Sequence, residues 1–131
     1  MTPDQYRADC DSASAYDMPI FEYAHDNTDH CSVTGGFVYR GRVFPEMVGH
    51  YFLADFCSGV LWDLDVAEHW APTAHEGMRS SLAGVSTLGQ DRYGELYLAN
   101  INSGAVYRLI EDTPITLLDG DVYLPLLSIS R

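Results

Sequence analysis

The sequence predicts an all-β fold, and three observations support this prediction. The composition favours strands joined by tight turns, because nine Tyr, five Phe and two Trp occur beside eleven Gly. No segment shows the 3.6-residue periodicity of an amphipathic helix. Residues 49–64 and 94–109 form an internal repeat with six of sixteen positions identical in register. A hairpin that recurs after 45 residues has the period of a four-stranded β-propeller blade, which predicts about two antiparallel blades.

Each copy of the repeat has the local features of a β-hairpin. A run of strand-forming residues leads into Ser58-Gly59 in the first copy and Ser103-Gly104 in the second, and another strand-forming run follows. The glycine supplies the positive φ that a tight hairpin requires. The alternative is two unrelated hairpins that share strand-forming residue types. Six identities in register make that interpretation the weaker one.

The remaining elements follow from local composition. Residues 1–18 contain few apolar side chains and are predicted as an N-terminal loop or truncated segment, whereas residues 19–110 would form the two blades. Within the blades we expect strands at 20–24, 33–40 and 82–88, a polar connection at 25–30, a loop at 41–49, a mixed segment with room for one strand at 67–80, and a turn at 89–93. Residues 111–131 form an apolar tail with strand-like alternation around 115–118 and 122–127.

The charge balance excludes several classes of partner. There are 19 Asp and Glu against 7 Lys and Arg, which gives a formal net charge of −12. Such a surface repels phosphate backbones and anionic membranes, so we expect no nucleic-acid partner. No apolar run reaches the roughly 20 residues that span a bilayer, so we expect no membrane insertion. The N-terminus has neither the basic start nor the apolar stretch of a signal peptide. Either the protein stays inside the cell or an export signal lies in missing upstream sequence.

Four motifs occur in an order that resembles a known family. They are PIFEYAH at residues 19–25, CSVTGGFVYRG at 31–41, PEMVGHYFLADFCSG at 45–59 and GQDRYGELY at 89–97. Together they resemble the late blades of the glucose/sorbosone dehydrogenase family, over about residues 17–110. That family includes PQQ-dependent sugar dehydrogenases and the propeller of Hedgehog-interacting proteins. The resemblance implies a six-bladed propeller, of which this chain would be the C-terminal third.

The same resemblance argues against catalysis by this chain alone. The dehydrogenases of the family bind PQQ and calcium at the mouth of the central channel, and their catalytic His lies in earlier blades. Cys57 stands where cofactor-binding members carry a Lys, and Gly84 and Ser86 stand where they carry two Arg. A PQQ tricarboxylate needs cationic partners, so we expect no cofactor and no catalytic residue in this chain. The sequence is then a fragment of a sugar-dehydrogenase-like propeller.

Two of the three cysteines are predicted to pair. Cys31 would precede one strand and Cys57 would end the next, so both thiols would lie at the same end of neighbouring strands. Chains of the Hedgehog-interacting-like branch carry cysteines at both positions, which resembles a family disulfide. The alternative is two buried thiols in a cytosolic protein. A disulfide would imply an extracellular or periplasmic location. Cys10 is left over, and its neighbourhood resembles a family segment whose partner cysteine lies upstream.

A binding module is the alternative function. Its first candidate residues for a protein or glycan ligand are His25, His30, Tyr39 and Arg40. Residues 25–30 contain two imidazoles and two carboxylates, which would suit a metal. They lack the alternating acidic spacing of a calcium loop, and a solvated connection is the favoured interpretation, so no metal site is assigned.

Self-association is the expected physical property. A propeller blade packs a sheet face against each neighbour, so two blades alone leave apolar faces open. Three copies of two blades would complete a six-bladed ring. The tail at residues 111–131 would then serve as an edge strand or as a strand exchanged with a neighbour.

Overall fold

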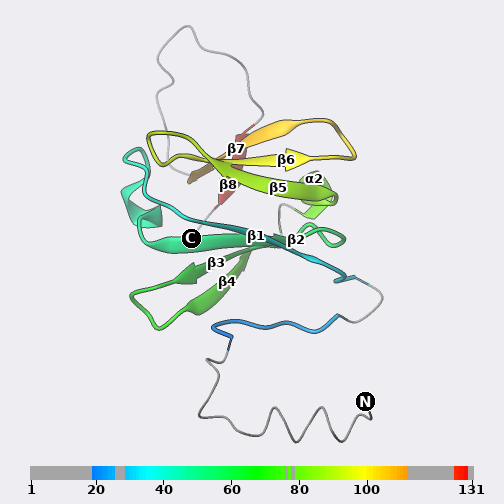
Figure 1. Cartoon of the computed structure of the whole chain (residues 1–131), viewed down its shortest axis with the longest axis horizontal. Helices are drawn as coiled ribbons and strands as arrows, with labels where there is room; N and C mark the ends of the chain where they lie inside the picture. Colours follow the sequence, from blue (N-terminus) through cyan, green and yellow to red (C-terminus); the bar gives the residue numbers. More distant parts are fainter. Residues whose placement is uncertain (1–18, 26–28, 76, 78, 112–125, 130–131) are drawn as a thin grey trace, which may run out of the picture.

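A computed structural model describes residues 19–25, 29–75, 77, 79–111 and 126–129, and this part of the chain is all-β (Figure 1). Its strands are β1 (Val33–Val38), β2 (His50–Asp55), β3 (Leu61–Asp65), β4 (Ala71–His75), β5 (Val85–Gln90), β6 (Leu96–Asn100), β7 (Val106–Glu111) and β8 (Leu126–Ile129). Two short helical turns, η1 (Pro45–Met47) and α2 (Arg79–Leu82), accompany them. The all-β prediction is confirmed.

The strands form two four-stranded sheets, in the orders β1-β2-β3-β4 and β5-β6-β7-β8. The sheets are stacked, and β1 lies beside β5 where they meet (Figure 1). This arrangement is consistent with two neighbouring propeller blades. The second copy of the repeat provides β6 and β7 as the first provides β2 and β3, so the repeat is a structural one.

The second sheet differs from the first at one strand. Every pair in the first sheet is antiparallel, but β8 pairs with β7 in parallel. A parallel pair needs a connection of about a dozen residues or more, and residues 112–125 supply that length. As the last strand of the second sheet, β8 occupies an edge of its own chain's sheet. The alternation expected at 115–118 lies outside the described residues.

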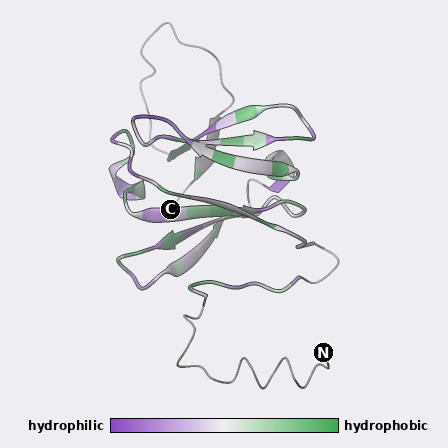
Figure 2. Ribbon diagram, in the orientation of Figure 1, coloured by the Kyte–Doolittle hydropathy of each residue, from purple (hydrophilic) through white to green (hydrophobic). Residues whose placement is uncertain are grey.

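The main core lies between the two sheets. Apolar side chains from both sheets and from the β1–β2 connection are fully or almost fully buried there: Tyr39, Phe44, Met47, Phe52, Ala54, Leu61, Leu82, Val85, Leu88, Leu96, Leu98, Leu109 and Ile129. Hydrophobic residues follow the strands, and the turns are more hydrophilic (Figure 2). Gly36 on β1 has no room for a side chain, because a Cβ there would lie 1.8 Å from the Phe52 carbonyl oxygen on β2 of the same sheet and 3.0 Å from a methyl of Leu88 on β5 of the other sheet.

A second apolar cluster covers the outer face of the first sheet. Leu53, Val60, Trp62 and Leu64 form it, and Phe21 and Tyr23 of residues 19–25 pack against it. The strand expected at residues 20–24 is therefore wrong. This segment lies across the face of the sheet instead of along an edge, so its backbone has no strand partner (Figure 1). Its strand-forming composition reflects burial on a pleated surface rather than ladder pairing.

Other boundaries moved by a few residues. The strand allowed for in residues 67–80 is β4. The strand expected at 82–88 begins only at Val85, because Leu82 closes α2 and Gly84 has a φ of +92°. The same strand continues through Gly89 to Gln90, so the following turn spans residues 91–95.

Candidate functional site

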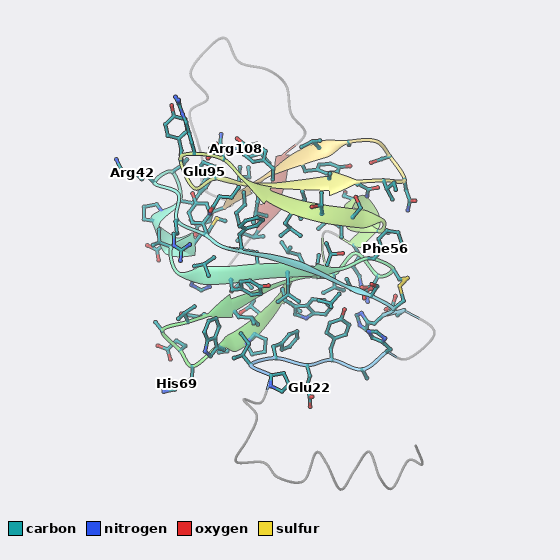
Figure 3. All side chains as sticks on the ribbon, in the orientation of Figure 1. Glu22, Arg42, Phe56, His69, Glu95 and Arg108 are labelled. Carbon is teal, nitrogen blue, oxygen red and sulfur yellow. A yellow bond between two sulfur atoms is a disulfide. The ribbon has the colours of Figure 1, made fainter. Side chains whose placement is uncertain are left out.

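The predicted site residues lie at opposite ends of the stacked sheets. One end holds the start of β1, the β2–β3 turn and α2, and we call it the disulfide end. The other holds the segment after β1 (residues 39–43) and the β5–β6 turn (residues 91–95), and we call it the arginine end. Figure 3 shows Phe56 at the disulfide end and Arg42, Glu95 and Arg108 at the arginine end.

Asp55 organises the disulfide end. Its side chain is fully buried at the end of β2. Its oxygens accept hydrogen bonds from the backbone N–H groups of Cys57 (3.0 Å), Ser58 (2.7 Å), Cys31 (3.0 Å) and Ser32 (2.9 Å), and from the Tyr23 hydroxyl (2.9 Å). One carboxylate thus ties the hairpin turn to the start of β1 and to the segment that covers the sheet.

The disulfide predicted between Cys31 and Cys57 is present at this junction. The two cysteines flank the carboxylate of Asp55, and the covalent bond joins the same two segments as its hydrogen bonds. The Phe56 N–H donates to the Ser32 carbonyl oxygen at 2.8 Å. Cys10 lies outside the described residues.

The environment keeps Asp55 ionised. Burial alone would raise the pKa of this carboxyl, but the N–H groups of Ser58 and Ser32 and the Tyr23 hydroxyl hold it at about 2. Burial and the neighbouring carboxylate raise the pKa of Tyr23 far above its usual range. A carboxylate saturated with donors at neutral pH is a structural acceptor and not an acid or base for catalysis.

Asn100 occupies the matching position in the second repeat with complementary chemistry. Its Oδ1 accepts from the N–H groups of Asn102 (2.9 Å) and Ser103 (3.1 Å), as Asp55 accepts from its own turn. Its Nδ2, however, donates to the carbonyl oxygens of Ser81 (2.9 Å) and Ala83 (3.0 Å). The segment before β1 presents N–H groups where the segment before β5 presents carbonyls. Asp suits the first position and Asn the second for that reason.

The three positions where a cofactor contact was expected lie at the disulfide end. Cys57 is in the disulfide. Gly84 has a φ of +92°, a backbone conformation that residues with longer side chains rarely adopt. The Ser86 hydroxyl is exposed and donates to the carbonyl oxygen of Ala99 at 3.3 Å. None of these groups is a cation, and the expected absence of a cofactor stays a prediction.

Two of the four predicted surface residues come together at the disulfide end. The Tyr23 ring lies 5.8 Å from the ring of His25 and 5.3 Å from that of His30, between centroids, and stacks on Trp62 at 4.7 Å. His30 Nδ1 is also 3.1 Å from the Ser58 hydroxyl. The two histidines therefore flank one aromatic ring at the edge of the outer cluster.

The other two predicted surface residues lie at the arginine end, and one of them is not at the surface. Tyr39 is fully buried, because its ring packs in the main core and its hydroxyl donates to Glu95 at 2.8 Å. Its assignment to a binding surface is wrong. Arg40 is exposed and lines a pocket with Arg42. Glu95 is itself buried and also accepts from the Arg42 N–H (3.2 Å) and from Arg108 (3.3 Å).

A buried cluster of Asp63 with two histidines in the first blade has a counterpart in the second in which the acidic and basic residue types are exchanged. Asp63 lies 2.8 Å from His50 Nδ1 and 2.6 Å from His75 Nε2. Burial would raise the pKa of Asp63, but hydrogen bonds from His75 and His50 lower it below its usual value. In the repeat, Glu95 and Arg108 take the places of His50 and Asp63. The residues of the described ranges include no group of three or more side chains placed to hold a metal ion.

Sequence reasoning missed Asp55, Asp63 and Glu95 as organising residues. Their partners come from other strands and connections, so no short motif marks them. One signal was available in the repeat. It aligns the carboxylate of Asp55 with the amide of Asn100, and the acid Asp63 with the cation Arg108. Matched polar residues inside apolar strands indicate buried networks.

Comparisons with known proteins do not identify a family. No model of a protein family matches the chain, and no solved structure matches it. In the described part of the chain, no helix has the length and apolar character needed to cross a membrane.

Proposed function

We propose that the chain is a pair of blades of a larger β-propeller resembling the glucose/sorbosone dehydrogenases, and that it completes its ring by self-association. The observation that carries this proposal is the stacking of two matched four-stranded sheets through β1 and β5. The matched hairpin networks at Asp55 and Asn100 support it, because they recur at the same place in each sheet. Neighbouring propeller blades have this relation.

Apolar surface on both outer faces supports association between copies. Residues 19–25 cover the first sheet only in part, and a groove of about 380 Å³ remains beside them, where Val33 is 56 % exposed and Ile20 is 54 % exposed. Val106 is 44 % exposed on β7 and points away from the main core, because it is three residues from the buried Leu109. A head-to-tail contact between the groove of one copy and the second sheet of another would form a ring if its rotation closes.

Sedimentation velocity of two matched variants tests the association. Val33→Glu places a charge in the groove and should shift the protein to smaller species. Val48→Glu is the control, because Val48 has a similar exposure of 54 % but follows η1 outside the groove. If both variants have the same sedimentation coefficients, the groove is not part of the proposed interface.

The proposal includes no turnover of sugars by the isolated chain. Cys57, Gly84 and Ser86 offer no cation to a tricarboxylate. Purified protein with added PQQ and calcium should therefore not reduce a dye in the presence of aldoses, while a quinoprotein sugar dehydrogenase in the same assay does. Aldose-dependent dye reduction by the chain would overturn this part of the proposal.

A glycan- or protein-binding module is the second candidate, and the grouping of His25 and His30 around Tyr23 favours it. The His25→Asn variant should lose a glycan-array or pull-down signal if this cluster binds the ligand. His69→Asn is the matched control, since His69 is exposed in the β3–β4 turn.

The proposal also includes an extracellular or periplasmic location. The disulfide supports it, because structural disulfides persist in oxidising compartments. Thiol labelling of freshly extracted protein should leave Cys31 and Cys57 unmodified until a reductant is added. Labelling without reductant would contradict the location.

A further inference from the structure

Cationic side chains gather at one pocket of this acidic chain. Of the 7 Lys and Arg in the sequence, four arginines line a pocket of about 960 Å³ at the arginine end: Arg40, Arg42, Arg92 and Arg108. They come from the segment after β1, from the β5–β6 turn and from β7, so both sheets contribute. Among the described residues, two carboxylates, Asp91 and Glu95, line the same pocket. A site with two more cations than anions stands out on a chain with a net charge of −12.

Both carboxylates are already occupied by hydrogen bonds. Glu95 accepts from the Tyr39 hydroxyl, from backbone N–H groups and from Arg108. Asp91 accepts from the N–H groups of Tyr93 (2.8 Å) and Glu95 (3.0 Å) and from the Tyr97 hydroxyl (3.2 Å). Burial would raise the pKa of Asp91, but these donors lower it, so the carboxyl is ionised and its oxygens are engaged. Among the described residues, neither acid forms an ion pair with Arg40, Arg42 or Arg92.

Three guanidinium groups stay available to a ligand. Within the described ranges, Arg40 and Arg42 are exposed and form no ion pair with a carboxylate. Arg92 lies over the ring of Tyr93, 4.5 Å from its centroid, and donates to its hydroxyl. Arg108 is held by Glu95, and its Nε is buried without a hydrogen-bond partner among the described atoms.

From this arrangement we infer that the pocket binds a small molecule that carries a multiply charged oxyanion such as a phosphate. A guanidinium presents a planar fork of donors that matches such oxygens, and several converging guanidiniums favour more than one negative charge. The Tyr93 ring is 63 % exposed at the pocket, and the face that Arg92 does not cover is available to the organic part of the ligand. Figure 3 shows Arg42, Glu95 and Arg108 of this site at the opposite end of the sheets from Phe56 of the disulfide end, and the inference does not depend on the proposed function.

Titration of the full chain with inorganic phosphate and with glucose 6-phosphate tests the inference. Chemical-shift changes of backbone amides, recorded at low ionic strength to limit screening, should saturate and should centre on residues 40–43 and 91–95. Tighter binding of the sugar phosphate would indicate that Tyr93 contacts the sugar, and equal binding would indicate that the site reads the anion alone; either result supports the site. The absence of saturable binding of both probes would overturn it.

Matched charge variants separate a built site from general electrostatics. The variant Arg42→Gln should bind about tenfold more weakly, because one lost charge-assisted contact contributes about that factor. Arg79→Gln removes a positive charge on α2 at the disulfide end, where Arg79 pairs with Asp29, and should bind within about twofold of the parent chain. Both substitutions fall on side chains that are at least partly exposed, and an unchanged melting temperature confirms folding. An equal loss in the Arg79 variant would refute the site.

Discussion

Replacing Asp55 with Asn removes one acceptor oxygen from the junction between the β2–β3 turn and the start of β1. The retained amide oxygen can still accept from Cys57 and Ser58, as Asn100 does in its own turn. The new amide nitrogen, however, faces the N–H groups of Cys31 and Ser32, which then have no acceptor.

The size of the effect follows from these two donors. An N–H group that loses its partner in a buried setting costs about 1–3 kcal/mol, which gives about 2–6 kcal/mol for two. Cys31 and Ser32 are exposed in part, so water replaces some of the lost interaction. The Tyr23 hydroxyl can rotate and accept from the new amide. We therefore expect a loss of about 2–3 kcal/mol in the free energy of unfolding.

Urea unfolding followed by tryptophan fluorescence measures this loss, since Trp62 lies in the outer cluster beside Tyr23. Asp65→Asn is the matched control, because Asp65 accepts backbone N–H groups in an exposed turn, at Ala67 (2.8 Å) and Glu68 (3.3 Å). The control should lose less than about 1 kcal/mol. A loss at Asp55 no larger than that of the control would refute the reasoning that acceptor chemistry decides between Asp and Asn in the two repeats.

Three further predictions test the packing and the electrostatics. Asp63→Asn breaks a buried charge cluster and should lower the free energy of unfolding by about 3 kcal/mol in thermal melts; a change below about 1 kcal/mol would mean that the cluster is not coupled to folding. Gly36→Ala should lower stability by about 3 kcal/mol or more, because its Cβ would meet the Phe52 carbonyl at 1.8 Å, whereas Gly35→Ala, with its nearest neighbour at 3.7 Å, should be tolerated; similar melting temperatures for both would contradict the close approach of β1 to β2 at Gly36. The pKa of Asp55 is depressed to about 2, so the stability that its ionised form contributes is complete above its usual value of about 3.9 and is lost as the pH falls toward 2. As the pH is lowered, the urea midpoint of Asp55→Asn should therefore fall less than that of the parent chain. Equal falls in the two proteins would exclude this stabilising role of the ionised Asp55.

The hairpins and the disulfide could be predicted from the sequence because their determinants are local. A Ser-Gly turn between strand-forming runs specifies a hairpin, and the 45-residue repeat shows that two exist. Once 33–40 and the first hairpin are neighbours, Cys31 and Cys57 must lie at one end, as they do.

The features that the sequence did not predict depend on contacts between residues that lie far apart along the chain. Residues 20–24 have strand-forming side chains, but their burial is against the face of the first sheet, which local propensity cannot distinguish from pairing at an edge. Tyr39 has the residue type of a binding surface, and only its contact with Glu95, 56 positions away, shows that it is buried. The arginine pocket is formed by three separate parts of the fold, so no spacing in the sequence marks it.

The mass of the chain in solution tests the central claim, that this is a pair of blades which completes its ring with further copies. Size-exclusion chromatography with light scattering on the full, oxidised chain measures it directly. We expect a mass close to three times the 14.6 kDa of one chain. A well-folded species of 14.6 kDa that shows no association as the concentration is raised would contradict the claim.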